Sequence, residues 1–468
     1  MVSKNKGIVN PISVAKNPVR HRKNTAEGGC GGNSAVFLQK IEASPAALLV
    51  KARHHRKILF SLGEKEIRRA QSEKSKEYFS AVRRVVASGG GAASFVRIGL
   101  VKSSDFVQDS QGVTFIPLLK TNKLTMKKLQ KLQKGDKVAV LSPSFAAPAI
   151  FPKVFELGLQ RIRGEFGLEP VEYPTTRKLN ASAEERARDL IAAFSDPEIN
   201  AVISSTGGDG QVTYIHKMPP EVFLKNPKPF LGYSDNSHFC NFLFQHGIPS
   251  YYGACVMTQF AMQGEMDRYA VENIRHALFD SGEYEINSSD EYNEIGLNWK
   301  DETLLTTKRT YEKNMGWVWD APIDGEGILW GGCLESIDDM LRNNVPIPSL
   351  KEFENIVLML ETSEEIPSHG YVQRVIRALG ERGMLLNIQG ILVGRPKAWE
   401  FDKPFTKEER TAYVKEQQKT VLETVRTYNK NIPVVQNMNF GHTDPQIPMP
   451  YGGKVRVDSN KRKIIVCF

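Results

Sequence analysis

The chain has 468 residues, of which 41% are hydrophobic and 25% are charged. This composition argues against a wholly disordered, collagen-like or membrane-embedded protein. The length favours two domains, because a single hydrophobic core rarely grows beyond about 250–300 residues. The five cysteines show no short paired spacing, so we expect neither a disulfide framework nor a zinc knuckle, and a reducing compartment fits them better.

The formal net charge of +9 is concentrated at one end of the chain. Residues 1–125 hold 22 Lys and Arg against 8 Asp and Glu, whereas the remaining residues hold 40 against 45. The larger part therefore has no electrostatic reason to bind nucleic acid or anionic lipid.

Residues 1–125 are predicted to be a poorly structured basic extension. Basic clusters at 20–23 and 53–57 alternate with glycine-rich patches, and only residues 64–87 have the pattern of a basic helix. Three interpretations stay open: an over-extended reading frame before a start at Met126, an organelle transit peptide, or a basic arm that contacts nucleic acid or a membrane surface. No apolar run approaches the ~20 residues that a membrane span needs.

Residues 126–287 alternate between short apolar runs and amphipathic segments. Strands are expected at 138–141, 200–205 and 229–233, and helices at 152–166 and after a capping box formed by Ser182 and Glu185. This rhythm predicts a doubly wound, mainly parallel sheet with helices on both faces. Ligands of such α/β sheets bind at the carboxyl ends of the strands.

Residues 288–322 are polar and lack periodicity, which is typical of a linker, a lid or part of a binding site. Residues 323–468 then predict a second α/β unit. Its expected strands are 323–330, 355–360, 388–393, 432–436 and 463–467, and its expected helices are 336–341, 371–380 and 406–427.

A glycine-rich turn, Gly207-Gly208-Asp209-Gly210-Gln211, follows a buried strand and precedes an expected helix. Glycines permit a sharp reversal, and the free backbone amides of such a turn can bind an oxyanion or a phosphate. The spacing is neither a P-loop nor a dinucleotide fingerprint, and a purely structural turn is an equally good interpretation.

Two further polar residues follow predicted strands. Glu361 ends the apolar strand at 355–360 and is well placed for proton transfer or ligand binding, although a capping or ion-paired role fits equally well. His442 lies in a loop after another strand and is a candidate acid or base, although a lone loop histidine is more often without a catalytic role. No His, Cys, Asp or Glu cluster has ligand spacing, so we expect no metal and no cofactor.

Five segments together resemble the LD-carboxypeptidase and microcin C self-immunity family of serine peptidases. They are 206–210, 227–236, 331–335, 360–364 and 440–443, in the family's order. The region that contains Trp299, Trp317 and Trp319 looks more like the microcin-immunity branch than the short murein carboxypeptidases.

The resemblance implies a doubly wound N-terminal domain over 126–287 and a smaller, swivelling C-terminal α/β domain over 323–468. It also implies a cytoplasmic homodimer with a Ser-His-Glu triad, in which Glu361 orients His442 as the base. The resemblance further assigns the oxyanion hole and the substrate contacts to Gly207, Gly208, Asp209, Ser234, Asp235 and Glu335.

The chain departs from the family at the nucleophile, because Gln211 occupies the position of the expected serine. A carboxamide cannot form an acyl-enzyme as an alcohol does. Three alternatives are open: Ser204 or Ser205 takes the role, His442 and Glu361 activate water with Gln211 positioning it, or the protein binds a ligand without cleaving it. The two upstream serines are poorly placed, because a nucleophile needs an exposed turn.

We therefore predict a serine-peptidase-like hydrolase that cleaves an amide next to a terminal carboxylate. The expected substrate is an LD-linked murein peptide or a microcin C-like aminoacyl nucleotide. The alternative is a catalytically silent homologue that binds such a ligand in the same cleft, and a third hypothesis gives the basic arm a nucleic-acid contact. The first two require Gln211, His442 and Glu361 to converge on one solvent-reachable hollow.

Overall fold

The computed structural model describes residues 125–468 in full and, before them, only the backbone of six short strands. These strands are β1 (Val50–Lys51), β2 (Lys57–Ile58), β3 (Tyr78–Val85), β4 (Ser94–Lys102), β5 (Val107–Gln108) and β6 (Thr114–Phe115). The helix predicted over residues 64–87 is wrong at β3, which pairs antiparallel with β4. Aromatic and β-branched residues in β3 favour a strand there. The other expectations for residues 1–124 lie outside the described residues.

The first sheet has six strands in the order β20-β11-β10-β9-β7-β8. Its strands are β7 (Lys137–Leu141), β8 (Glu169–Glu172), β9 (Ile199–Ser204), β10 (Phe230–Gly232), β11 (Ser250–Tyr252) and β20 (Met449–Tyr451). Five of them run parallel, and β20 is antiparallel to β11. The first unit carries the helices α2 (Pro152–Phe166), α3 (Ala183–Ser195), α4 (Glu221–Lys225), α5 (Ser237–Gln245) and α6 (Arg268–Phe279).

Both faces of this sheet are covered, as predicted. Along β7, Ala139 and Leu141 join one hydrophobic cluster, whereas Val138 and Val140 join another. The first cluster contains residues of α3 and α5, and the second contains residues of α2 and α6. Because successive strand residues point to opposite faces, this division places helices on both sides of the sheet.

Local signals in the sequence explain where two of these helices begin. Pro152 starts α2 in the first turn, where its missing N–H costs nothing. The predicted capping box precedes α3, since the Ser182 side chain accepts from the Glu185 amide and the Glu185 side chain accepts from the Ser182 amide.

The second sheet has eight strands in the order β12-β22-β21-β16-β17-β18-β19-β15. Its strands are β12 (Glu283–Ile286), β15 (Val318–Asp320), β16 (Gly325–Cys333), β17 (Ile356–Glu361), β18 (Gly390–Gly394), β19 (Val434–Met438), β21 (Lys454–Asp458) and β22 (Lys463–Cys467). Strands β16 to β19 are parallel, and the others are antiparallel to their neighbours. This unit carries the helices α7 (Leu334–Arg342), α8 (Leu350–Phe353), α9 (His369–Glu381) and α10 (Lys407–Tyr428).

The two units exchange strands. β12 precedes the predicted boundary at residue 287 but belongs to the second sheet, whereas β20, near the C-terminus, closes the edge of the first sheet. The segment 288–322 contains β15 and the small ribbon of β13 (Glu291–Tyr292) with β14 (Glu312–Lys313). The domain boundaries at residues 287 and 323 therefore stay predictions. Each sheet takes one strand from outside the predicted range of its own domain.

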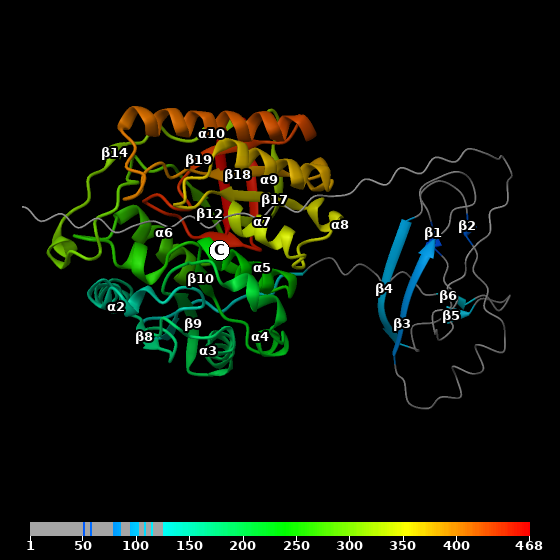
Figure 1. Cartoon of the computed structure of the whole chain (residues 1–468), viewed down its shortest axis with the longest axis horizontal. Coiled ribbons are helices and arrows are strands. Elements are labelled where there is room, and N and C mark those ends of the chain that lie inside the picture. Colours follow the sequence, from blue (N-terminus) through cyan, green and yellow to red (C-terminus); the bar gives the residue numbers. More distant parts are fainter. Residues whose placement is uncertain are drawn as a thin grey trace, which may run out of the picture. The chain divides into compact units, whose positions relative to one another are not determined.

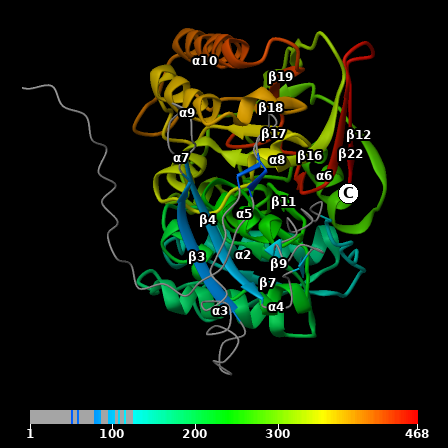
Figure 2. The ribbon, with the colours of Figure 1, turned by 90° about the vertical axis from the view of Figure 1, so that its right-hand side faces the viewer.

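One hydrophobic cluster runs through both units of residues 125–468 and includes Phe239 from α5 and Trp330 from β16. The Trp330 indole also donates to the Asn241 side chain at 3.0 Å. In both ribbon views α9 and α10 lie at the end of these residues opposite to α3 and α4 (Figures 1 and 2). The carboxyl ends of the two parallel sheets meet between these layers, where the predicted site residues lie.

Candidate functional site

The structure brings Glu361 and His442 together. Glu361 is the last residue of β17, and His442 lies in the loop after β19, two strands away in the same parallel sheet. His442 Nδ1 lies 2.7 Å from Glu361 Oε2. Both side chains are almost fully buried, with 7% and 0% of their surface exposed. The predicted pairing of an imidazole with an orienting carboxylate is thus present in the geometry.

A glycine permits this close approach. Gly441, the residue before His442, has φ +97°, and a Cβ at Gly441 would lie 2.7 Å from Glu361 Oε2. A side chain at position 441 would therefore strain the backbone and push against the carboxylate.

The second oxygen of Glu361 is bound from the other sheet. Tyr252, the last residue of β11, donates its hydroxyl to Glu361 Oε1 at 2.5 Å and accepts the Ser234 backbone N–H at 3.0 Å. Tyr252 is fully buried. This chain of hydrogen bonds connects the turn after β10 to the carboxylate that holds His442.

Glu364 binds the other ring nitrogen of His442. Its Oε2 lies 3.0 Å from His442 Nε2, and about half of the Glu364 side chain is exposed. Burial disfavours the imidazolium, but Glu361 and Glu364 outweigh it and raise the pKa of His442 to about 10. Burial alone would raise the pKa of Glu364, but the charge of His442 and its hydrogen bond outweigh burial and lower that pKa to about 2. The two carboxylates therefore favour the protonated form of His442.

Gln211 forms no hydrogen bond to His442 or Glu361 among the described residues. Its backbone N–H donates to Asp235 Oδ2 at 3.0 Å, and its Nε2 donates to Asn236 Oδ1 at 2.8 Å. The side chain is fully buried, and Oε1 has no partner among the described residues. The described contacts thus join Gln211, at the predicted nucleophile position, to Asp235 and Asn236, and its convergence with His442 and Glu361 stays a prediction.

The glycine-rich turn leads into a different element from the one predicted. Gln211–Thr213 is a three-residue 3-10 turn, so the expected helix at this point is wrong. Nevertheless, the amides of Gly207, Gly208 and Asp209 donate to no acceptor among the described residues. A Cβ at Gly208 would clash with the Ser144 hydroxyl, which explains the glycine. These amides keep their capacity to bind an oxyanion.

Asp235 is hydrogen-bonded to both the glycine-rich turn and the loop after β7. Its Oδ2 accepts from the Ser144 hydroxyl and from the Gln211 amide, and only 3% of its surface is exposed. Burial raises the pKa of Asp235 to about 6, although both hydrogen bonds oppose that rise. Asp235 therefore holds two loops together, and its predicted contact with a ligand stays a prediction.

Glu335, at the start of α7, is likewise engaged within the protein. Its Oε1 accepts from the Ser363 amide at 3.1 Å and from the Ser363 hydroxyl at 2.7 Å, and its Oε2 accepts from Cys333 Sγ at 3.3 Å. Burial raises the pKa of Glu335. Glu335 thus holds the segment after Glu361 in place, and its predicted contact with a substrate stays a prediction.

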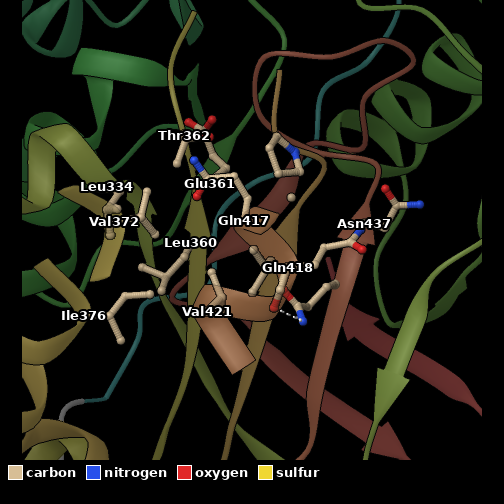
Figure 3. A pocket seen from close by; sticks show the side chains of 14 residues that line it. Leu334, Leu360, Glu361, Thr362, Val372, Ile376, Gln417, Gln418, Val421 and Asn437 are labelled. Carbon is tan, nitrogen blue, oxygen red and sulfur yellow. Dashed lines mark hydrogen bonds between the residues drawn. The ribbon is translucent and has the colours of Figure 1, made fainter. Parts of the chain in front are cut away.

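A pocket lies beneath Glu361 and Thr362, between β17 and the helices α9 and α10 (Figure 3). Apolar side chains such as Leu360, Ile376 and Val421 line much of it. This pocket backs the site and does not open beside His442, which is absent from its lining.

The segment 288–322 is fastened to the second unit by buried ion pairs. Arg410 contacts Glu294 and Glu312, each at 2.6 Å, and Arg309 pairs with Asp444, two residues after His442. The Trp317 indole donates to the Asn439 side chain at 3.0 Å. The segment thus braces the loop that carries His442.

Sequence reasoning missed Tyr252 and Glu364. Tyr252 ends a buried strand, so the rule that sites lie at carboxyl ends of strands could have indicated it. Glu364 lies within the segment 360–364 already noted for Glu361. No apolar span in the described helices is long enough to cross a bilayer. Residues 125–468 also contain no group of three or more His, Cys, Asp or Glu suited to a metal ion.

Comparison with known proteins extends these observations. The chain is 27% identical over 341 residues to YocD of Bacillus subtilis (strain 168), which covers 70% of this chain and 95% of that protein. It is 22% identical over 339 residues to the microcin C7 self-immunity protein MccF of Escherichia coli, covering 71% and 93% of the two chains.

A crystal structure of an MccF-like protein from Streptococcus pneumoniae in complex with AMP is similar in fold. Its TM-score is 0.62 at 27% identity, with 71% of this chain and 98% of that chain covered. Residues 138–253 match the model of the LD-carboxypeptidase N-terminal domain, and residues 326–457 match that of the LD-carboxypeptidase C-terminal domain. Because these two matches span more than half of the chain in the family's order, the chain belongs to the LD-carboxypeptidase family.

Proposed function

We propose that this chain hydrolyses an amide next to a terminal carboxylate in a small ligand, either an LD-linked murein peptide or an aminoacyl nucleotide. The carrying observation is the 2.7 Å contact between His442 Nδ1 and Glu361 Oε2. A carboxylate that holds one ring nitrogen orients the imidazole and leaves the other nitrogen to exchange a proton.

The surroundings of the pair support chemistry more than simple packing. Both Glu361 oxygens are bound, which leaves the carboxylate little freedom to rotate. The amides of Gly207, Gly208 and Asp209, which donate to no acceptor within residues 125–468, supply donors for a developing negative charge. The AMP in the Streptococcus pneumoniae structure favours a nucleotide-containing ligand as one of the two substrate classes.

A second candidate function is ligand binding without cleavage. It is favoured by the buried side chain of Gln211, which is bonded to Asn236 and carries no nucleophilic group. The contact between Glu364 and His442 Nε2 also favours it, because it occupies the nitrogen that a base would use.

Incubation of the full chain with each substrate class separates the two functions. One reaction contains an LD-linked murein tetrapeptide and the other an aminoacyl sulfamoyl adenosine, with products followed by mass spectrometry. We expect turnover that is lost in His442→Ala and kept in the control His276→Ala, a histidine of α6 outside the site. Tight binding with no product from either compound contradicts hydrolysis and supports the second function.

The homodimer and the cytoplasmic location stay predictions of the family resemblance. Light scattering of the purified chain at several concentrations tests the first, and fractionation of cells tests the second. A monomer at micromolar concentration contradicts the dimer.

A further inference from the structure

Arg395 directly follows β18, at the carboxyl end of the parallel strands that also carry Glu361 and His442. β18 lies between β17, which ends at Glu361, and β19, which leads to His442. The Arg395 backbone N–H donates to Met438 O at 2.9 Å, and a Cβ at Gly394 would lie 2.9 Å from Glu361 Cβ. Because ligands of α/β sheets bind at the carboxyl ends of the strands, Arg395 begins a loop on the border of the candidate site.

The guanidinium of Arg395 is buried without an ion pair. Only 7% of the Arg395 surface is exposed. Its Nη2 donates to Asn314 Oδ1 at 2.5 Å, and its Cζ lies 3.7 Å from the centre of the Tyr292 ring. Arg309 nearby pairs with Asp444, whereas Arg395 pairs with no carboxylate within residues 125–468. A buried charge without a counter-ion is costly, so an unpaired arginine at the carboxyl end of a strand calls for an anionic partner.

The acidic residues near Arg395 are committed to another arginine. Glu294 and Glu312 both contact Arg410, each at 2.6 Å. Burial lowers the pKa of Arg395, and the more distant charges of the two glutamates offset this effect only in part. A carboxylate in direct contact would instead hold the guanidinium firmly in its charged form. The protein thus supplies no counter-ion for Arg395 from residues 125–468.

Two nitrogens of Arg395 keep their N–H groups available. Its Nε and Nη1 donate to no acceptor within residues 125–468. They are also not fully enclosed, unlike the unpartnered Nε atoms of Arg309 and Arg410. Guanidinium N–H groups complement the oxygens of a carboxylate or a phosphate in both charge and geometry. Arg395 therefore offers the donors that an oxyanion needs.

The segment 288–322 fixes the plane of this guanidinium. Tyr292 ends β13 and Asn314 follows β14, the two strands of the small ribbon in that segment. The Asn314 side chain is itself held, since its Nδ2 donates to Ser289 O at 3.0 Å. A guanidinium that is already stacked and bonded on one side loses little further freedom when it binds an anion, which favours affinity.

We propose that Arg395 binds an oxyanion of the ligand, either the carboxylate of a peptide or the phosphate of a nucleotide, an inference that rests on the proposed function. Both proposed substrate classes carry such a group. With the anion held after β18 and the amide presented to His442 after β19, one ligand lies across the ends of two neighbouring strands. Arg395 then contributes to ligand affinity and orientation and takes no part in proton transfer.

Two pairs of ligands that differ in one charged group test this assignment. One pair is an LD-linked murein tetrapeptide and its C-terminal carboxamide, measured in the full chain with His442→Ala so that neither compound is consumed. The other pair is AMP and adenosine, measured in the wild-type chain. Titration calorimetry should show that the anionic member of at least one pair binds about 10–100-fold more tightly, as expected for hydrogen bonds to a charged group.

Three variants separate anion binding from a purely structural role. Arg395→Met removes the charge and should abolish most of the preference for the anion, with little change in affinity for the neutral member. Arg395→Lys keeps a charge without the planar fork and should give an intermediate preference. The control Arg374→Met changes an exposed arginine of α9 and should keep the full preference. Circular dichroism checks that each variant is folded.

Each outcome bears on the inference separately from the proposed function. Equal affinity for both members of each pair overturns the anion site without any Arg395 variant and leaves hydrolysis standing. A preference that persists in folded Arg395→Met, or an equal loss of affinity for both members, also overturns it. A preference that Arg395→Met abolishes supports the anion site even if the wild-type chain forms no product, a result that contradicts hydrolysis alone. The pair that shows the preference identifies the anion as carboxylate or phosphate.

Discussion

The exposed carboxylate of Glu364 lies 3.0 Å from His442 Nε2, the ring nitrogen opposite the one that Glu361 holds. An imidazolium between two carboxylates is stable as a cation and weak as a base. Access of a ligand to His442 is therefore coupled to the position of Glu364.

Replacing Glu364 by Gln should lower the pKa of His442 below its value of about 10, because one of its two neighbouring carboxylates loses its charge. NMR titration of the His442 ring measures the change. The matched control is Glu365→Gln, the next and likewise exposed residue. An unchanged titration midpoint in Glu364→Gln contradicts the contact.

The stability of the fold should depend on the protonation of His442. Its folded pKa lies above the ordinary value of 6.5, so the folded state binds the proton more tightly than the unfolded state does. This stabilisation is complete below about pH 6.5 and is lost as the pH rises through about 10. Denaturant unfolding should show that the free energy of unfolding falls as the pH rises between these limits, and that it falls less in His442→Gln. An equal fall in both proteins contradicts a stabilising role of the His442 proton.

Tyr252→Phe should lower the free energy of unfolding by about 1–3 kcal/mol, because it leaves Glu361 Oε1 and the Ser234 amide without their shared partner. Turnover should fall as well, since Glu361 becomes free to rotate. The control is Tyr284→Phe, because the Tyr284 hydroxyl makes no hydrogen bond to a residue from 125 to 468. Equal losses of stability and turnover in the two variants would contradict a specific role of the Tyr252 hydroxyl.

Gln211→Ser should not create a catalytic serine. The side chain at position 211 is buried and directed to Asn236, and nothing in the described contacts directs it to His442. We expect a modest loss of stability from the missing amide contact and no large gain in turnover. An increase in turnover of about 10³-fold would contradict this expectation and would show that a serine at position 211 can act as the nucleophile.

Gly441→Ala should disrupt the pair of Glu361 and His442. The added Cβ would meet Glu361 Oε2 at 2.7 Å, and φ +97° is strained for alanine. We expect a loss of ~1–3 kcal/mol in stability together with a large loss of turnover. Gly370→Ala is a matched control in α9, where no atom lies within 4 Å of the added Cβ and alanine favours the helix.

Much of the architecture could be predicted from local patterns. The helix α2 occupies the predicted residues 152–166, and the capping box at Ser182 precedes α3 as expected. These features depend on backbone chemistry within a few residues, which the sequence displays directly. Glu361 and His442 could be named as candidates because each follows a predicted strand, whereas their pairing was implied by the family resemblance.

Only the tertiary structure decided what the remaining site residues do. The direction of the Gln211 side chain depends on Asn236, 25 positions later, and the pairing of Glu361 depends on Tyr252, 109 positions earlier. The backbone of Ser234 has φ +65°, a conformation that leaves no pattern in composition or periodicity. Such features arise because strands that are distant in the chain pack at one edge of a sheet. The side-chain rotamers and hydrogen bonds there depend on spatial neighbours, and the order of residues along the chain does not reveal these neighbours.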